Sequence, residues 1–197
     1  MDFALLHDAF WGLTFDGLAL GAIYALISLG YTLVYGVLRL INFAHSEVFM
    51  IGTFSALVAS GIMGVKVEDD PRTGWGMVFT LLVCLIAAML ASGITAVLVE
   101  IVAYRRLRQR GATKLATLIS AIGVSISLVE LFRIITDSLP REFPRIMDKT
   151  FLFSYAGADI RNDKVIVIIA AGLMMFALER FISKSRYGKG IRAVSMD

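Results

Sequence analysis

Long apolar runs alternate with short charged intervals along most of this chain. A helix needs about 20 apolar residues to cross the hydrocarbon core of a bilayer, and five runs reach or approach that length. We place the spans at residues 15–37, 40–63, 77–103, 115–135 and 165–182. The pattern predicts an all-α, polytopic membrane helical bundle with about five transmembrane helices.

The charges between the runs indicate how the bundle is oriented. Residues 65–76 form an acidic loop, whereas residues 104–114 hold five basic residues and no acid, and residues 183–197 are basic again. Basic loops tend to stay in the cytoplasm. Two spans separate the two basic segments, which therefore lie on the same side. We expect five spans with the N-terminus outside and the C-terminus inside.

The longest polar interval lies at residues 137–164, where Pro140 and Pro144 interrupt a mixture of acids and bases. We expect an external loop there, with a short helix or a hairpin. The span after it has a short uncharged core, so Glu179 and Arg180 at its end must pair or extend toward the membrane interface.

Small residues recur at every fourth position in several of the expected spans. Such spacing lets two helix backbones approach closely in a membrane. The first three spans each carry such a stripe: Gly17, Gly21 and Ala25; Gly52, Ala56 and Ser60; and Ala88, Ser92 and Ala96. We predict that these stripes mark helix contacts.

Composition supports a membrane protein and excludes several other classes. Hydrophobic residues make up 58% of the chain, and its mean hydropathy is +0.78. The net charge of +3 is modest and follows from the two basic segments, which fits cytoplasmic loops better than nucleic-acid binding. The single cysteine, Cys84, allows no internal disulfide. We find no nucleotide-binding phosphate loop, catalytic motif or metal-ligand spacing, and so expect no catalytic residue, metal or cofactor.

Four polar residues near the start of the second span are the candidates for function: Asn42, His45, Ser46 and Glu47. If residues 40–56 are helical, the first three share a face, and polar groups at membrane depth must find partners or line a path. The alternative is that Asn42 and Ser46 bond the backbone beside a tight turn. Glu47 points elsewhere, and we expect it to bond a neighbouring helix. Because His45 and Glu47 lie on different faces, they do not form a catalytic pair.

Five sequence blocks resemble one transporter family. They begin Gly21-Ala-Ile-Tyr, Ile41-Asn-Phe-Ala-His, Glu100-Ile-Val-Ala-Tyr, Leu118-Ile-Ser-Ala and Ser185-Arg-Tyr-Gly-Lys-Gly. In this order and spacing they are similar to the permeases of high-affinity branched-chain amino-acid ABC transporters, the LivH type. The block around Asn42 is the most specific, and the resemblance covers nearly the whole chain.

The resemblance implies import of leucine, isoleucine and valine across a bacterial cytoplasmic (inner) membrane. It also implies a second permease subunit, two cytoplasmic ATPase subunits and an external solute-binding protein as partners, with membrane lipid around the spans. ATP hydrolysis in a partner agrees with the missing phosphate loop. A urea or amide ABC permease, a secondary transporter and a structural subunit remain alternatives. Secondary transporters often contain inverted repeats, and no convincing repeat is seen here.

Three features depart from the family pattern. Ser46 stands where Gly is usual, which tightens the local packing. Arg106 stands where Pro is common, so the third helix can run further into its loop. The family continues well beyond the length of this chain, and we expect residues 1–197 to be the N-terminal portion of one permease domain.

The final block supplies candidates for ATPase contact: Gly188, Gly190, Arg192 and Ala193. The two glycines permit a sharp turn where the last span leaves the bilayer. A short helix with a small apolar face beyond them suits docking to a soluble partner. The alternative is a basic anchor on anionic headgroups, because each basic residue near that surface contributes about 1 kcal/mol.

Overall fold

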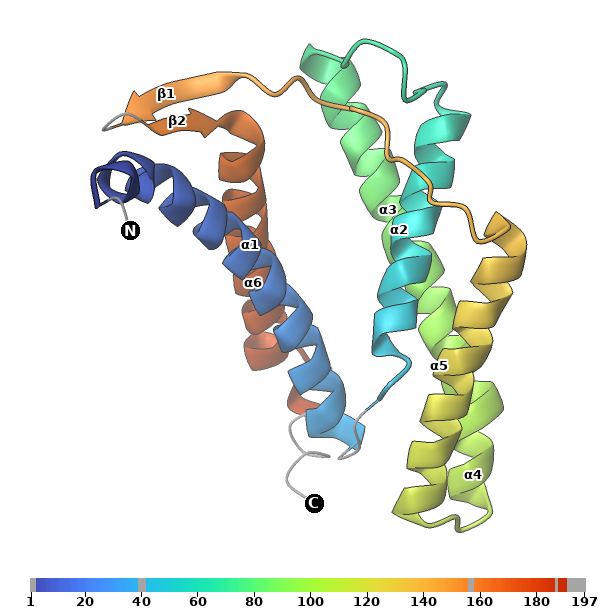
Figure 1. Cartoon of the computed structure of the whole chain (residues 1–197). Coiled ribbons are helices and arrows are strands. Elements are labelled where there is room, and N and C mark those ends of the chain that lie inside the picture. Colours follow the sequence, from blue (N-terminus) through green and yellow to red (C-terminus); the bar gives the residue numbers. More distant parts are fainter. Residues whose placement is uncertain (1–2, 39–41, 156–157, 187, 191–197) are drawn as a thin grey trace. The chain divides into compact units, whose positions relative to one another are not determined.

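The computed structural model describes residues 3–38, 42–155, 158–186 and 188–190. The chain divides into two compact units, which are treated separately below: Met1–Arg39 with Lys149–Asp197, and Leu40–Asp148. The first unit contains α1 (Phe3–Leu38), β1 (Phe151–Tyr155), β2 (Ala158–Arg161) and α6 (Asn162–Lys184). The second contains α2 (His45–Ile62), α3 (Gly74–Val99), the π-helical segment η1 (Glu100–Arg105), α4 (Arg106–Gln109) and α5 (Lys114–Thr136) (Figure 1).

Five helices in the described part of the chain are long and apolar enough to span a membrane. The prediction of a helical membrane bundle with about five spans is therefore confirmed, although a small β-hairpin is also present. The helices extend beyond the expected spans at several ends. One extension joins α3, η1 and α4 into a single candidate span, Gly74–Gln109, which carries the helix past Arg106 as its sequence suggested.

In the second unit, α2 packs against α3 through small residues. A Cβ atom added at Gly52 would lie 2.5 Å from the hydroxyl oxygen of Ser92. The hydroxyl of Ser92 donates to the carbonyl oxygen of Val48 at 3.0 Å, and the thiol of Cys84 donates to that of Ala56 at 3.5 Å. The predicted contact between these two stripes is confirmed.

The stripe on α1 behaves differently. A Cβ atom added at Gly17 or Gly21 would meet no other atom within 4 Å among the described residues. Within the described part of the first unit these two glycines mark no close contact between helices, and the contact expected of this stripe stays a prediction.

Arg72 organises one end of the second unit. Its guanidinium donates to the carbonyl oxygen of Met63 at 2.6 Å, after the end of α2, and to the hydroxyl of Thr80 in α3 at 3.0 Å. Its backbone N–H donates to the carbonyl oxygen of Ile146 at 3.1 Å. Thr80 is fully buried, and Ile146 belongs to a small apolar core that also contains Val65. One residue, through its side chain and its backbone, thus connects the ends of α2 and α3 with the segment that holds Ile146.

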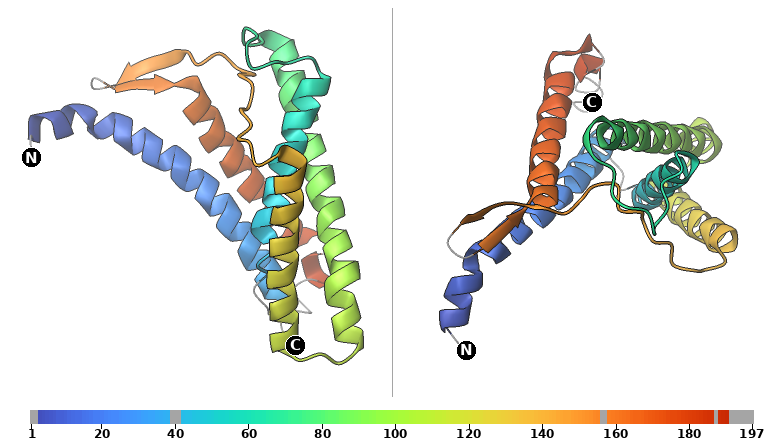
Figure 2. Two further views of the ribbon diagram at one scale, coloured as in Figure 1. Left: turned by 45° about the vertical axis from the view of Figure 1, so that its right-hand side comes forward. Right: turned by 90° about the horizontal axis from the view of Figure 1, so that it is seen from above.

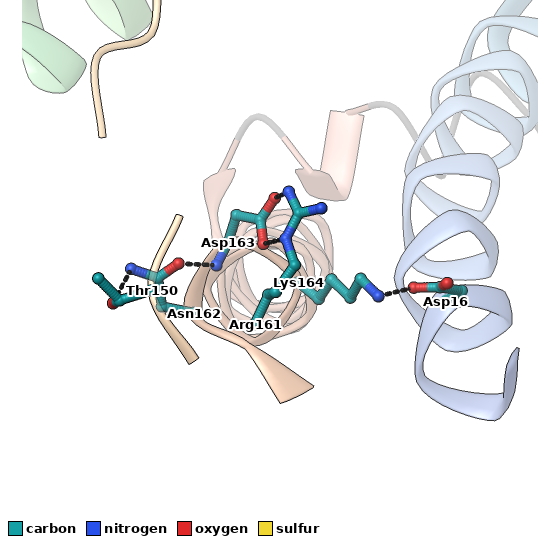
Figure 3. A network of polar contacts seen from close by, with 6 residues as sticks. All are labelled: Asp16, Thr150, Arg161, Asn162, Asp163 and Lys164. Carbon is teal, nitrogen blue, oxygen red and sulfur yellow. Dashed lines mark hydrogen bonds and ion pairs between the residues drawn. The ribbon is translucent and has the colours of Figure 1, made fainter. Parts of the chain in front are cut away.

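In the first unit, α1 and α6 begin at the same end and run side by side (Figures 1 and 2). The antiparallel hairpin β1–β2 leads directly into α6 and contains an irregularity between Phe151 and Phe153. Polar contacts fix the start of α6: Arg161 pairs with Asp163, Asn162 donates to Thr150, and Lys164 pairs with Asp16 of α1 (Figure 3).

Candidate functional site

Asn42 builds the turn that precedes α2. Its backbone carbonyl accepts a hydrogen bond from the N–H of His45 at 3.2 Å, and its side-chain oxygen accepts one from the N–H of Ala44 at 3.1 Å. Asparagine side chains often bond the backbone two residues on, and this competes with helix formation. Asn42 therefore lies before the helix, which begins at His45. Residues 42–44 are therefore not helical, and the interpretation in which Asn42 and Ser46 bond the backbone beside a tight turn is confirmed.

Tyr104 gives the same asparagine a second partner. Its hydroxyl donates to the side-chain oxygen of Asn42 at 2.6 Å, and the tyrosine is only 5% exposed. Tyr104 lies in η1, and π-helical segments inside α-helices are frequent at functional sites. The Asn42 oxygen thus joins the turn before α2 to the far end of the α3 helix. We call this pair the Asn42–Tyr104 junction.

Ser46 and Glu47 form a second local interaction in the first turn of α2. The Ser46 hydroxyl donates to a carboxylate oxygen of Glu47 at 2.9 Å, and Glu47 is 9% exposed. Among the described residues the partner of Glu47 is thus its neighbour in sequence, and the bond expected to a neighbouring helix is not seen there. A glycine at position 46 could not supply it. The helix N-terminus also favours a carboxylate in its first turn.

His45 is the first residue of α2 and is half-buried. The four candidates therefore do not form one continuous polar stripe. Asn42 bonds Tyr104, whereas Ser46 bonds Glu47 within its own turn. The arrangement contains hydrogen-bonded pairs that fix a helix start and a helix end. This is the chemistry of a positioning site, since neither pair is a nucleophile held by a base.

The junction lies beside the basic segment. Glu100, four residues before Tyr104 in η1, accepts hydrogen bonds from Arg105, at 3.1 Å, and from Arg108. These ion pairs are half-exposed and stabilise the helix end only weakly in solvent. Their position shows that the junction is at the basic end of α3, near where a membrane interface is expected, rather than at the middle of a span.

At the end of α6 the chain turns at Ser185, whose extended backbone ends the helix. The Ser185 hydroxyl oxygen accepts a hydrogen bond from the N–H of Gly188 at 2.8 Å. A Cβ atom at Gly188 would overlap the backbone of Ile182. Only a residue without a side chain fits here, because the two backbone segments approach each other closely. Gly190 has open space around it. Arg192 and Ala193 lie outside the described residues.

Two important residues were missed from the sequence. Tyr104 was assigned to the basic loop, and Arg72 to an acidic loop without a role. The signal for Tyr104 was its place within a family-like block. For Arg72 the signal was its position as a lone arginine directly after three acidic residues and a proline. Neither signal identifies the distant residue with which Tyr104 or Arg72 bonds. By contrast, the local pair of Glu130 and Arg133, predicted from helical spacing, is present at 2.8 Å.

These helices define a polytopic α-helical membrane protein. Residues 13–197 match the family model described as "Branched-chain amino acid transport system / permease component". The chain is 36% identical over 185 residues to the high-affinity branched-chain amino acid transport system permease protein BraD of Pseudomonas aeruginosa, which covers 92% of this chain. It is 36% identical to LivH of Escherichia coli and 35% identical to LivH of Salmonella typhimurium, over 93% of this chain in both cases.

The chain therefore belongs to this family of branched-chain amino-acid transport permeases. It spans 58% of the length of each of these three relatives. No solved structure shows significant similarity to it. With its five apolar helices, the chain is a multi-pass protein of the inner membrane. The relatives are permease components of transport systems, which favours this class over a secondary transporter or a structural subunit.

Proposed function

We propose that this protein is the membrane-spanning permease subunit of an ABC importer for branched-chain amino acids. The observation that carries the proposal is the family match over residues 13–197, with relatives named for high-affinity branched-chain amino-acid transport. Since the sequence contains no phosphate-binding loop, the ATP is hydrolysed by partner subunits. The substrates are leucine, isoleucine and valine.

The proposed assembly contains a second permease subunit, two cytoplasmic ATPase subunits and an external solute-binding protein. The turn at Ser185 supports an ATPase contact, because it separates the segment that begins at Gly188 from the α6 helix. In this proposal Gly188, Gly190, Arg192 and Ala193 belong to the contact. Ala193→Trp should then reduce co-purification of the ATPase without reducing membrane insertion, whereas Leu173→Trp on the exposed face of α6 should change neither.

The proposal gives the four polar candidates two roles. Asn42, held by Tyr104, positions the start of α2 against the end of the α3 helix. His45 and the Ser46–Glu47 pair present polar groups at the start of α2, where the substrate path reaches the basic end of the helices. Support comes from the buried position of Tyr104 and Glu47, because buried polar groups that are fully bonded rigidify a structure.

The test is deletion of the gene in the organism that encodes it, followed by uptake of radiolabelled leucine, isoleucine and valine at low concentration. We expect uptake to fall and to return when the gene is restored. It should also require ATP and persist when the proton gradient alone is collapsed. Unchanged uptake of all three amino acids would overturn the substrate. Loss of urea or amide uptake would favour the amide-permease alternative, and dependence on an ion gradient would favour a secondary transporter.

A further inference from the structure

Helix α1 is too long to be only a transmembrane span. Its 36 residues extend about 54 Å at 1.5 Å per residue, whereas the hydrocarbon core of a bilayer is about 30 Å thick. A helix can absorb some excess length by tilting. The excess here is so large that the position of the membrane boundary along α1 has to be found from its neighbours.

Helix α6 provides that boundary. It begins beside the charged residues Arg161, Asp163 and Lys164, and it ends with Glu179, Arg180 and Lys184. The uncharged stretch between them, residues 165–178, is only about 21 Å long. Because a shift in either direction would bury one charged end, the depth of α6 in the bilayer is fixed, with its first turn at one interface.

An ion pair between α6 and α1 shows which residue of α1 lies at the same membrane boundary. The ammonium of Lys164 pairs with the carboxylate of Asp16 (Figure 3). Asp16 is therefore level with the first turn of α6, at the same interface. From Asp16 to Leu38 the helix is about 33 Å long, which is enough to cross the hydrocarbon core by itself. Residues 3–15 thus lie outside that core.

The segment outside the core nevertheless exposes large apolar side chains. Phe10 and Leu13, which share a face of α1, are 56% and 60% exposed. In the hairpin beside it, Phe151 and Leu152 are also exposed, while Ile160 is buried. Helix α1 packs against the hairpin through β2, and Figure 2 shows its first turns bending away from the axis of the rest of the helix.

We propose that residues 3–15 of α1, together with the hairpin β1–β2, form an interfacial layer that inserts shallowly into the lipid surface. The exposed side chains of Phe10, Leu13, Phe151 and Leu152 enter the boundary between headgroups and acyl chains. Arg161 and Lys164, paired with Asp163 and Asp16, lie at headgroup level. The occupant of this apolar surface is lipid, because the ion pair places the surface directly at the bilayer edge. This inference does not depend on the transported substrate.

Spin-label accessibility in reconstituted full-length protein tests the proposal. The single cysteine, Cys84, is replaced by serine to keep a hydrogen-bond donor to Ala56, and single cysteines for the label are then introduced at chosen positions. The interfacial positions are Phe10, Leu13 and Leu152. Glu68, in an exposed loop, is the aqueous reference, and Leu173, exposed near the middle of α6, is the deep reference. Accessibility of the label to molecular oxygen reports a hydrocarbon environment, and accessibility to a nickel chelate reports an aqueous one.

We expect the three interfacial labels to show similar ratios of oxygen to nickel accessibility, several-fold above Glu68 and several-fold below Leu173. Ratios equal to that of Glu68 would overturn the proposal and indicate a surface for a soluble partner. A ratio at Leu13 close to that of Leu173 would also overturn it, because α1 would then enter the bilayer near its start.

A second measurement keeps the native cysteine. Residues 1–197 contain two tryptophans, Trp11 and Trp75, so Trp75→Phe leaves Trp11 as the reporter in this part of the protein, and any tryptophan elsewhere in the full-length protein is also replaced by phenylalanine. The fluorescence of Trp11 should be quenched most by lipids brominated near the headgroup. Strong quenching by aqueous iodide, or maximal quenching by bromine at the chain ends, would contradict the proposal.

Discussion

The side-chain oxygen of Asn42 accepts hydrogen bonds from Tyr104 and from the N–H of Ala44. Tyr104→Phe removes one donor and leaves the other bond in place, so we expect a loss of about 0.5–1.5 kcal/mol. Asn42→Leu leaves both buried donors without an acceptor, and the loss should be larger, about 1–3 kcal/mol. Thermal unfolding in one detergent, supported by denaturant titration, measures both.

Tyr35→Phe is the matched control for that comparison, because Tyr35 is 56% exposed and lies on α1. Its unfolding should match that of the wild-type protein. If Asn42→Leu unfolded like this control, the junction would contribute nothing to stability, and its role in positioning α2 would have to be rejected.

Gly52 allows a second residue-scale prediction. Because a Cβ atom there would lie 2.5 Å from the Ser92 hydroxyl oxygen, Gly52→Ala should push α2 and α3 apart and cost about 1–3 kcal/mol. Gly61→Ala on the same helix has open space and should cost no stability. Combining Gly52→Ala with Ser92→Ala should recover part of the loss. A double-mutant cycle without coupling would contradict this packing.

Spacing along a helix predicts contacts between residues three or four positions apart, and such predictions succeeded for Glu130 with Arg133. It also marked the small residues that allow α2 to approach α3. It contains no information about partners far apart in sequence, and Asn42 and Tyr104 are 62 residues apart. The bond from Asn42 to the backbone two residues on was one of the two interpretations offered for it, because asparagine commonly makes this bond at a turn.

At the scale of elements, Arg72 should hold the ends of α2 and α3 together. Arg72→Met keeps much of the apolar stem but removes the bonds to the Met63 carbonyl and the Thr80 hydroxyl. Hydrogen bonds to charged groups contribute about 1.5–3 kcal/mol, so we expect a loss in that range. We also expect faster proteolysis within residues 139–148, whose backbone pairs with that of Arg72.

Arg141→Met is the control for Arg72, since Arg141 lies in the same polar interval and is exposed. It should alter neither unfolding nor the rate of cleavage. Identical cleavage rates for the two variants would show that Arg72 does not fix this interval.

Two elements could not be assigned from sequence. The η1 segment has the apolar pattern of the helix around it, and one extra residue per turn leaves no mark in a pattern read over so short a stretch. The hairpin was one of two options for residues 137–164, because short strands between charged residues have little periodicity. Long apolar helices were assigned reliably because the bilayer imposes their length.

For the whole molecule, hydropathy and family membership agree on a multi-pass permease, whereas the side that each loop faces depends on charge alone. The basic segments at residues 105–114 and 184–192 predict that both are cytoplasmic. Reporter fusions after Arg110 and after Lys189 should therefore report the cytoplasm, and a fusion within residues 68–72 should report the outside.

The ion pair between Asp16 and Lys164 adds an independent constraint to this topology. It places the starts of α1 and α6 at one interface, and the hairpin enters α6 at that same end. If the end of α6 is cytoplasmic, the hairpin must be outside. A cysteine at Lys149, which is exposed just before the hairpin, should therefore react in the Cys84→Ser background with a membrane-impermeant maleimide in intact cells, whereas one at Arg110 should react only after the membrane is opened. An impermeant reagent that labels Arg110 but not Lys149 in intact cells, or a cytoplasmic reporter signal at Asp70, would reverse the orientation.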